Sequence, residues 1–391
     1  MNLSGFLPIN TIPVTLDFNQ TTMHIYFDAK RYFYNPTGLG NYSRWLVNSY
    51  HQFYPEDKLF LCTPRLNKPT DFDTADEKKT IEYTNFLGLN RVFGLYHKIP
   101  GSSIFHGLTN ELPYFPKASK VATVVTVHDI IFKLRPEGYK WADRMIYHLK
   151  TQYAIRRADR IICMSQMTKN DLIEHYGADE AKLEVVYQNC LPFYYSEPST
   201  AEWSDWRQSY NPPMDFILSV GTFNERKNHK SIIDAYSLIP LCDRITTYLI
   251  GSGPLKDELL QRIESRGLSS WIKILSNVTL PQLRCFYKAA NLAIYPSLYE
   301  GYGLPVLESL ACGTVVIVHK ACATVEAGGR AVSQVDCNSR EQLAAEIVEM
   351  QKNKVLQSKY LEEFIFHLEE LRIDKLMKQM NKYLQKCIVN I

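Results

Sequence analysis

An α/β protein made of two doubly wound domains is the fold that the amino-acid sequence predicts. Short apolar stretches, such as residues 23–29, 121–129 and 215–222, alternate with helical stretches, which is typical of parallel sheets covered by helices. A proline-containing segment over 190–213 interrupts this alternation, and a second series of strands and helices then begins. The chain of 391 residues also exceeds the usual size of one domain. Two α/β domains in tandem are expected to face a cleft, where ligand sites are often found.

The order of these patterns divides the chain into five predicted segments. They are a leader over 1–22, an N-terminal domain over 23–195, a linker over 196–213, a C-terminal domain over 214–355 and closing helices over 356–391. The leader lacks the basic start and the apolar core of a signal peptide, and the sequence leaves both Met1 and Met23 open as the start. We expect the closing helices to pack back towards the N-terminal domain.

Composition and charge are those of an ordinary globular protein. Apolar residues make up 46% of the chain, charged residues make up 22%, and a net charge of +3 gives no reason to propose nucleic acid as a partner. Nine scattered cysteines without a C-x-x-C pair argue against a disulfide scaffold and a zinc site, and favour a reducing compartment. No apolar run approaches the ~20 residues that span a bilayer. We therefore expect a cytoplasmic protein without a metal site.

The most informative segment runs from Glu300 to Glu308. An apolar strand leads into a loop with two glycines, and Pro305 suits the first turn of the helix that follows. Small residues such as Gly303 let a ligand approach the backbone, and a helix N-terminus presents N–H groups to an anion. Paired carboxylates accept hydrogen bonds from neighbouring sugar hydroxyls. The alternative is a structural turn whose glutamate is favoured by the helix dipole.

A second strand, loop and helix start spans residues 219–228. Gly221 follows the strand, and Arg226 and Lys227 lie in the loop after it. A guanidinium and an ammonium together can offset the charge of a departing nucleoside diphosphate. Taken alone, these residues are better interpreted as two solvated loop cations, but their place one strand–loop–helix unit after the linker favours the functional interpretation.

In the N-terminal half, Gly38 and Gly40 lie between the first strand and a helix. The full G-x-G-x-x-G fingerprint is absent because Arg44 stands near the place of the last glycine, so the sequence does not support dinucleotide binding. His128 ends another apolar strand, at the edge where open α/β sheets bind ligands. A single histidine is nonetheless often a purely structural residue.

Together these residues carry a resemblance to a known family. The segments TGLGNYSRWLV, VVTVHDIIFKLRPE, RRADRIICMSQMTKNDLIE, KLEVVYQN, VGTFNERKNHKSIIDAY, LIGSGP and EGYGLPVLESLACGTVVIV occur in one order between Met23 and Leu343. This set resembles the family 4 retaining glycosyltransferases of the GT-B fold, especially the bacterial mannosyltransferase-like group of O-antigen and capsule synthesis. The resemblance implies two Rossmann-like domains, with the acceptor on the N-terminal one and the nucleotide-sugar on the C-terminal one.

The resemblance also assigns expected roles to individual residues. Glu300 would contact the donor sugar, and Glu308 would hold the ribose hydroxyls. Arg226 and Lys227 would bind the donor diphosphate, and His128 would lie by the sugar and the reacting centre. The remaining expected donor-site residues are Gly38, Gly40, Ser165, Gly221, Gly303, Leu304 and Pro305.

The activity that the resemblance implies is metal-independent hexosyl transfer with retention at the anomeric carbon. GDP-mannose is the favoured donor, a UDP- or dTDP-sugar stays open, and the acceptor is a glycan or a lipid-linked glycan of surface polysaccharide synthesis. Two rival interpretations remain: a nucleotide-sugar 2-epimerase of the same fold, and a non-catalytic nucleotide-sugar-binding protein.

A basic and aromatic segment lies between Lys133 and Arg160. It holds eight lysines and arginines against three acidic residues, with Tyr139, Trp141 and Tyr147 among them. A helix of this kind can rest on an anionic membrane surface, which predicts peripheral contact with the inner face of the cytoplasmic membrane. The alternative is a helix that packs its aromatic side chains inward and turns its charges to water.

Overall fold

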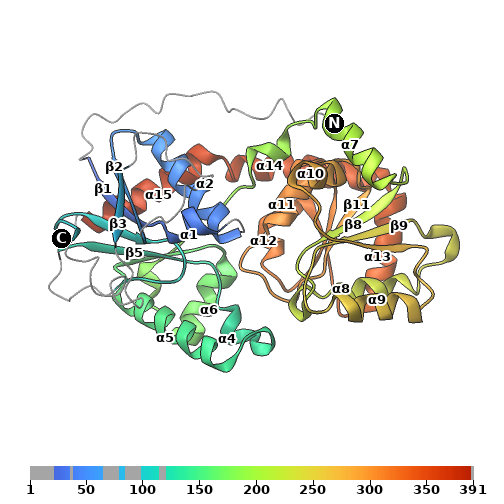
Figure 1. Ribbon diagram of the computed structural model, residues 1–391, viewed down its shortest axis with the longest axis horizontal. Helices are drawn as coiled ribbons and strands as arrows, with labels where there is room; N and C mark the ends of the chain where they lie inside the picture. The colour runs from blue at the N-terminus through green and yellow to red at the C-terminus, as the bar shows by residue number, and fades with distance from the viewer. Residues whose placement is uncertain (1–21, 36–37, 65–78, 84–97, 114–119, 389–391) are drawn as a thin grey trace. The chain divides into compact units, whose positions relative to one another are not determined.

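The computed structural model describes residues 22–35, 38–64, 79–83, 98–113 and 120–388. Within these residues the chain forms two compact units. The first unit comprises the described residues up to 188 together with 371–388, and the second unit comprises 189–370. Each unit holds one parallel sheet (Figure 1), so the predicted pair of parallel-sheet α/β domains is confirmed.

In the first unit the described strands form a seven-stranded parallel sheet, in the order β3-β2-β1-β4-β5-β6-β7. Its strands are β1 (His24–Asp28), β2 (Lys58–Pro64), β3 (Lys79–Tyr83), β4 (Ile104–Gly107), β5 (Ala122–Val127), β6 (Arg160–Cys163) and β7 (Leu183–Val185). The order changes direction between β1 and β4, and β5 lies on the other side of β4. All strands are parallel, so the residues that follow β1, β4 and β5 lie at one edge of the sheet.

The helices in the described residues of the first unit are α1 (Lys30–Tyr34), α2 (Gly38–Phe53), α4 (Ile131–Leu134), α5 (Trp141–Arg157), α6 (Gln166–Tyr176) and α15 (Ile373–Ile388). Local signals explain the bounds of α6. The Ser165 side chain accepts a hydrogen bond from the Thr168 N–H at the N-cap, and Gly177 closes the helix in the left-handed region with φ of 60°.

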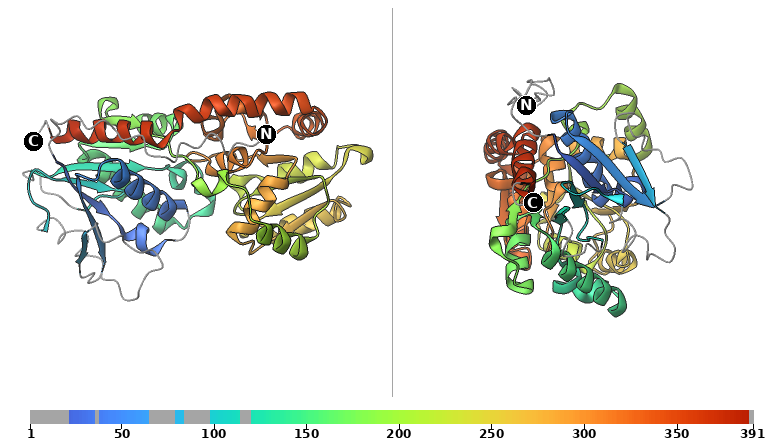
Figure 2. Two further views of the ribbon diagram at one scale, coloured as in Figure 1. Left: turned by 90° about the horizontal axis from the view of Figure 1, so that it is seen from above. Right: turned by 90° about the vertical axis from the view of Figure 1, so that its left-hand side faces the viewer.

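The C-terminal helix α15 belongs to the first unit and packs against α2 (Figure 2). The amide of Asn381 donates to the Tyr50 hydroxyl at 2.8 Å, and that hydroxyl donates to Asp57 Oδ2 at 2.8 Å. The preceding helix α14 (Lys354–Glu370) belongs to the second unit instead. The closing helices were expected to pack back towards the N-terminal domain. Of the two, α15 belongs to that unit, whereas α14 belongs to the second unit.

In the second unit the sheet has six parallel strands in the order β10-β9-β8-β11-β12-β13. Its strands are β8 (Phe216–Val220), β9 (Thr246–Ile250), β10 (Ile272–Leu275), β11 (Leu292–Tyr295), β12 (Val316–His319) and β13 (Val332–Val335). Its helices, besides α14, are α7 (Thr200–Tyr210), α8 (His229–Tyr236), α9 (Lys256–Ser265), α10 (Leu280–Ala289), α11 (Leu304–Ala311), α12 (Thr324–Gly328) and α13 (Arg340–Lys352). The strands β8 and β11 are neighbours, so the loops that follow them leave the sheet side by side.

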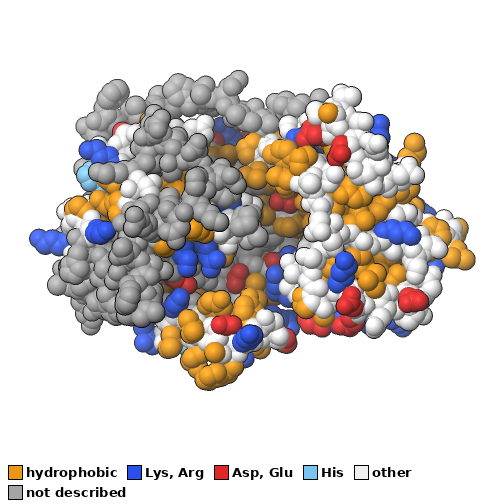
Figure 3. Space-filling view, viewed as in Figure 1, with side chains coloured by type: hydrophobic (Ala, Val, Ile, Leu, Met, Phe, Trp, Pro, Cys, Tyr) orange, Lys and Arg blue, Asp and Glu red, His pale blue; other side chains and the backbone are white. Residues whose placement is uncertain are grey.

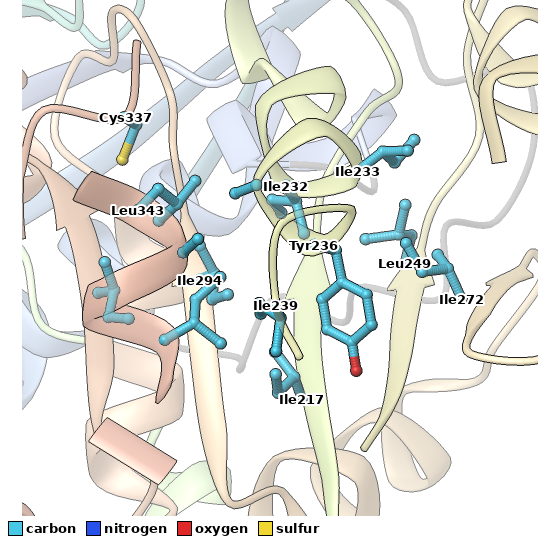
Figure 4. Close-up of a cluster of buried hydrophobic side chains, with 14 of the residues drawn as sticks. Ile217, Ile232, Ile233, Tyr236, Ile239, Leu249, Ile272, Ile294, Cys337 and Leu343 are labelled. Carbon is cyan, nitrogen blue, oxygen red and sulfur yellow. The ribbon is translucent and has the colours of Figure 1, made fainter. Parts of the chain in front are cut away.

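One hydrophobic core of the second unit lies between this sheet and the helices α8 and α13 (Figure 4). Ile217, Leu249 and Ile294 point from the strands towards Ile232 and Tyr236 of α8, and all five are fully buried. The spacing of four residues between Ile232 and Tyr236 places both side chains on one face of α8. This packing holds β8 and β11, whose loops carry the candidate site.

The segment 196–213, predicted as a linker, contains the helix α7 within the second unit. Ser199 and Glu202 form a capping box at its N-terminus, and Trp206 is buried against the ring of Phe286. Arg284 of α10 binds Glu202 through two hydrogen bonds of 2.8 Å. The Ser-x-x-Glu signal was present in the sequence, but the prolines around it favoured a loop.

All nine cysteines lie among the described residues and are free thiols. Eight of them are buried, and Cys242 is exposed. In the described part of the chain, no helix is both long enough and apolar enough to cross a membrane.

Candidate active site

Glu300 lies at the centre of a compact ion cluster after β11. Its Oε2 is 2.5 Å from Arg226 Nη1, and its Oε1 is 2.6 Å from Lys227 Nζ. The residue is only 9% exposed. Burial by itself would raise the pKa of Glu300, but Lys227 and Arg226 lower it to about 2. The carboxylate is therefore ionised at neutral pH, and the cluster of two cations and one anion keeps one net positive charge.

The loop after β8 places the two cations of this cluster. Asn224 caps the short turn Glu225–Lys227 by accepting from the Lys227 N–H at 3.0 Å, and Asn228 ends it in the left-handed region. Arg226 also donates to the Tyr299 carbonyl at 2.8 Å, which ties this loop to the one after β11. The turn that carries both cations is thus capped by Asn224, and Arg226 is also held by a carbonyl of the loop after β11.

The start of α11 lies directly after Glu300 in the chain. Gly303 precedes the helix with φ of +122°, and a Cβ at this position would lie 2.9 Å from Thr324 Cγ2. Both observations require glycine there. Leu304 and Pro305 form the first residues of the helix and are partly exposed, so the N-terminus of α11 is open to an anion.

Glu308, one turn into α11, has the opposite protonation behaviour. The Tyr287 hydroxyl donates to its Oε2 at 3.0 Å, and Tyr194 supplies a second hydrogen bond. Burial raises the pKa of Glu308 to about 7, although both tyrosines and Lys227 act to lower it. The two carboxylates of this segment therefore differ in charge state near neutral pH, with Glu300 ionised and Glu308 partly protonated.

In the first unit, His128 lies at the end of β5 in a fixed orientation. Its Nε2 is 2.9 Å from the Leu108 carbonyl, and its backbone N–H donates to Asn110 Oδ1 at 2.9 Å. The ring of Tyr42 meets the imidazole edge-on at 4.6 Å. Burial lowers the pKa of His128 to about 4, so the ring is neutral. Because a carbonyl only accepts, Nε2 carries the hydrogen and Nδ1 is left as the acceptor.

Gly38 and Gly40 begin α2 in the first unit, and their surroundings differ. A Cβ on Gly40 would lie 1.7 Å from the Asn35 carbonyl oxygen, whereas a Cβ on Gly38 would meet nothing within 4 Å. Arg44 fixes the same turn, since its Nη1 donates to the carbonyls of Tyr32 and Asn35 at 2.7 and 3.0 Å. Gly40 is therefore required by the fold, and Gly38 is not.

Replacing Gly40 by alanine should lower the free energy of unfolding by about 1–3 kcal/mol, because backbone and not a flexible side chain occupies the space. Gly38→Ala is the matched control and should stay within about 0.5 kcal/mol of the wild type. Chemical denaturation of both variants measures the difference. Equal stability of the two variants would contradict the described turn.

Ser165, expected to be near the donor, is fully buried as the N-cap of α6. Its hydroxyl donates to Thr168 Oγ1 at 3.0 Å, and Thr168 Oγ1 donates to the His128 carbonyl at 3.1 Å. Ser165 thus supports the backbone of His128 through Thr168. Its role towards a ligand stays a prediction.

The predicted residues fall into two groups, one in each unit. The second unit brings together Arg226, Lys227, Glu300 and the start of α11, and a Cβ added at Gly221 would lie 3.4 Å from Lys227 Cδ. The first unit holds His128, Gly38, Gly40 and Ser165. Sequence reasoning missed the hydroxyls of Tyr194 and Tyr287, because neither residue lies near Glu308 in the chain.

Comparisons with known proteins agree with this architecture. The family model described as glycosyl transferases group 1 matches residues 204–365, and the model described as glycosyltransferase family 4 matches residues 103–188. The O-antigen chain mannosyltransferase B of Escherichia coli is 28% identical over 84% of this chain and 90% of its own. The serotype-specific mannosyltransferase WbdA of Escherichia coli is 30% identical over 50% of this chain, but over 25% of its own length.

Solved structures show the same fold. The Alr3699/HepE protein of Anabaena, solved in complex with UDP, matches with a TM-score of 0.67 and 19% sequence identity. The match covers 94% of this chain and 100% of that one. The two Rossmann-like units therefore define a protein of the GT-B class. With the group 1 model matching its C-terminal part and the family 4 model matching its N-terminal part, the protein is a glycosyltransferase.

Proposed function

We propose that the protein is a retaining glycosyltransferase that transfers a hexose from a nucleotide-sugar to a glycan or lipid-linked glycan. Mannose is favoured as the hexose and GDP-mannose as the donor, because O-antigen mannosyltransferases are among its relatives. The observation that carries the proposal is the ion cluster of Arg226, Lys227 and Glu300 beside the start of α11.

The donor diphosphate binds, in this proposal, at Arg226, Lys227 and the N-terminus of α11. A nucleoside diphosphate that leaves carries negative charge, and two cations with oriented N–H groups stabilise it without rearrangement. The two cations are paired with Glu300. The diphosphate must therefore share them with the carboxylate, which limits the affinity for the leaving group and helps product release.

Glu300 then orients the donor sugar and stabilises positive charge at the anomeric carbon. Its pKa of about 2 keeps it anionic throughout the reaction. It accepts hydrogen bonds from sugar hydroxyls and forms no covalent bond. The acceptor hydroxyl attacks on the face from which the diphosphate leaves, and a phosphate oxygen takes its proton. No side chain has to act as a strong nucleophile.

His128 and Glu308 complete the donor contacts in this proposal. The neutral imidazole presents Nδ1 to a sugar hydroxyl near the reacting centre, because Nε2 is used by the Leu108 carbonyl. Glu308 accepts from the two ribose hydroxyls, one on each oxygen, and the protonated acid binds them more weakly because one of its oxygens carries a hydrogen. The tyrosines that already donate to Glu308 hold it in place for this contact.

A thermal-shift screen against GDP-, UDP-, dTDP- and ADP-sugars tests the donor. We expect GDP-mannose to raise the melting temperature most, since a ligand that binds only the folded state stabilises it. The variant Lys227→Met should abolish the shift, while Lys230→Met, a nearby surface lysine paired with Glu225 and Glu258, should keep it. No shift with any nucleotide-sugar would contradict the proposal.

Two rival interpretations, a nucleotide-sugar 2-epimerase and a non-catalytic nucleotide-sugar-binding protein, differ from the proposed enzyme in whether an acceptor is required and whether turnover occurs. An epimerase converts the donor without any acceptor, so a new sugar formed in a donor-only incubation would identify it. A binding protein would show the thermal shift without turnover against any acceptor pool.

We place the proposed reaction in the cytoplasm, at the inner face of the membrane where lipid-linked acceptors are presented.

A further inference from the structure

The first half of α5 carries an apolar face that its own unit leaves uncovered. The buried side chains of this helix are Thr151, Ala154 and Ile155, all in its second half. Trp141 is 72% exposed and Leu149 is 56% exposed. Figure 3 shows hydrophobic side chains gathered over α4 and α5 at the lower edge of the view. The alternative of an inward-packed aromatic face holds in part, since the ring of Tyr147 packs against Phe132, but it does not hold for Trp141.

These apolar side chains are arranged as one ridge. Trp141, Met145 and Leu149 follow each other at intervals of four residues, so they lie above one another on the helix surface. Ile146 lies beside them and is also exposed, as is Tyr139 just before the helix. We call this set the α5 ridge. An exposed apolar group of this size marks an interaction site more often than a free surface.

Cations surround the α5 ridge and indicate what covers it. Arg135, Lys140 and Arg156 are exposed near its two ends, and Lys150 is exposed although it forms a 3.3 Å ion pair with Glu111. Between Lys133 and Arg160 the chain has eight basic and three acidic residues. A second copy of the same face would repel this excess charge. An anionic lipid surface complements it and takes up tryptophan, tyrosine and aliphatic side chains at the level of its headgroups.

We propose that the α5 ridge and its flanking cations dock the first unit on an anionic phospholipid surface. The ridge enters the headgroup region while Arg135, Lys140 and Arg156 bind lipid phosphates. The helices α4 and α5 follow His128 directly in the chain. Docking through them brings a lipid-linked acceptor to the unit that carries this histidine. In that respect the inference rests on the proposed function and names its membrane partner.

The test compares two double variants in vesicle co-sedimentation without donor or acceptor. The vesicles contain phosphatidylcholine alone, or phosphatidylcholine mixed with phosphatidylglycerol. Trp141→Glu with Leu149→Glu removes the ridge. Phe366→Glu with Leu241→Glu is the matched control, because these side chains of the second unit are 71% and 70% exposed. The melting temperature of each variant confirms that it is folded.

We expect the wild type and the control to bind only the phosphatidylglycerol vesicles, and less so at high salt. The ridge variant should bind at least about tenfold more weakly. Equal binding of all three proteins, or no dependence on phosphatidylglycerol, would overturn the proposal. So would a concentration-dependent dimer that the ridge variant abolishes, since a second copy would then cover the face. Donor binding is measured separately, so failure of vesicle binding leaves the proposed transfer reaction untouched.

Discussion

Glu300→Gln should lower the rate of glycosyl transfer by at least about 100- to 1,000-fold while the protein stays folded. The amide keeps the shape of the side chain and one hydrogen-bond acceptor, but it loses the charge that the pKa of about 2 maintains in the wild type. The charge developed at the anomeric carbon is then no longer offset. The rate is measured with saturating donor, so that a change in donor affinity does not mask the loss.

The same substitution should have an opposite effect on the free nucleoside diphosphate. Arg226 and Lys227 lose their competing partner, so the diphosphate should bind more tightly than it does to the wild type. A protein that was merely misfolded would lose both transfer and binding. Glu300→Ala is the harsher variant, since it leaves two partly buried cations without their carboxylate, and breaking such a cluster costs about 3–5 kcal/mol. Transfer by Glu300→Gln at the wild-type rate would contradict the assigned role.

Donor affinity should rise by up to about tenfold between pH 6 and pH 8, because only ionised Glu308 offers both oxygens as acceptors to the ribose hydroxyls. With a pKa of about 7, most Glu308 side chains are protonated at pH 6 and most are ionised at pH 8. Titrating the wild type with nucleotide-sugar across this range measures the change. Glu308→Gln should bind weakly at all pH values and show a flat profile.

Tyr194→Phe tests more directly than Glu308→Gln whether the pKa of Glu308 sets the pH dependence of donor binding. Removing one hydroxyl that stabilises the ionised form should raise the pKa of Glu308 and move the binding profile to higher pH. A residue with only a packing role would weaken binding without moving the profile. The groups near Glu308 include Tyr194, Tyr287, Tyr295, Lys227, Cys190 and Cys312. The thiol pKa values of both cysteines are raised by burial, so they stay neutral in this range.

The free energy of unfolding should fall as the pH rises, whereas donor affinity should increase. The pKa of Glu308 is raised from 4.5 in the unfolded chain to about 7 in the folded one. Its contribution to the free energy of unfolding is therefore fully present below pH 4.5 and is lost as the pH rises through 7. Donor binding improves over the same range in which this contribution falls. The protein gains affinity at the expense of stability at this residue.

The strand–loop–helix units of the candidate site could be predicted from the sequence because their signals are local. Gly303 and Pro305 mark the start of α11, and both features hold in the structure. The doubly wound fold places the first and fourth strands of a domain side by side, so the meeting of the loops after β8 and β11 follows from the predicted fold. The ion pairs of Arg226 and Lys227 with Glu300 could not be predicted, because they depend on how these two loops fold.

Two further features depended on contacts between distant segments. Tyr194 reaches Glu308 from a segment more than a hundred residues away, so the raised pKa of that carboxyl has no local signal. The exposure of Trp141 was equally hidden, because the composition of α5 suits a packed helix as well as a docked one. Long-range contacts, not local propensity, decided each of these cases.

Calorimetric titration with a nucleoside diphosphate tests the central claim most directly, namely that Arg226, Lys227 and Glu300 form the donor diphosphate site. The wild type, Glu300→Gln, Lys227→Met and the control Lys230→Met are compared under one buffer condition. The ion cluster predicts tighter binding to Glu300→Gln, at least about tenfold weaker binding to Lys227→Met, and an unchanged affinity for Lys230→Met. Equal affinities for all four proteins would show that the diphosphate binds elsewhere.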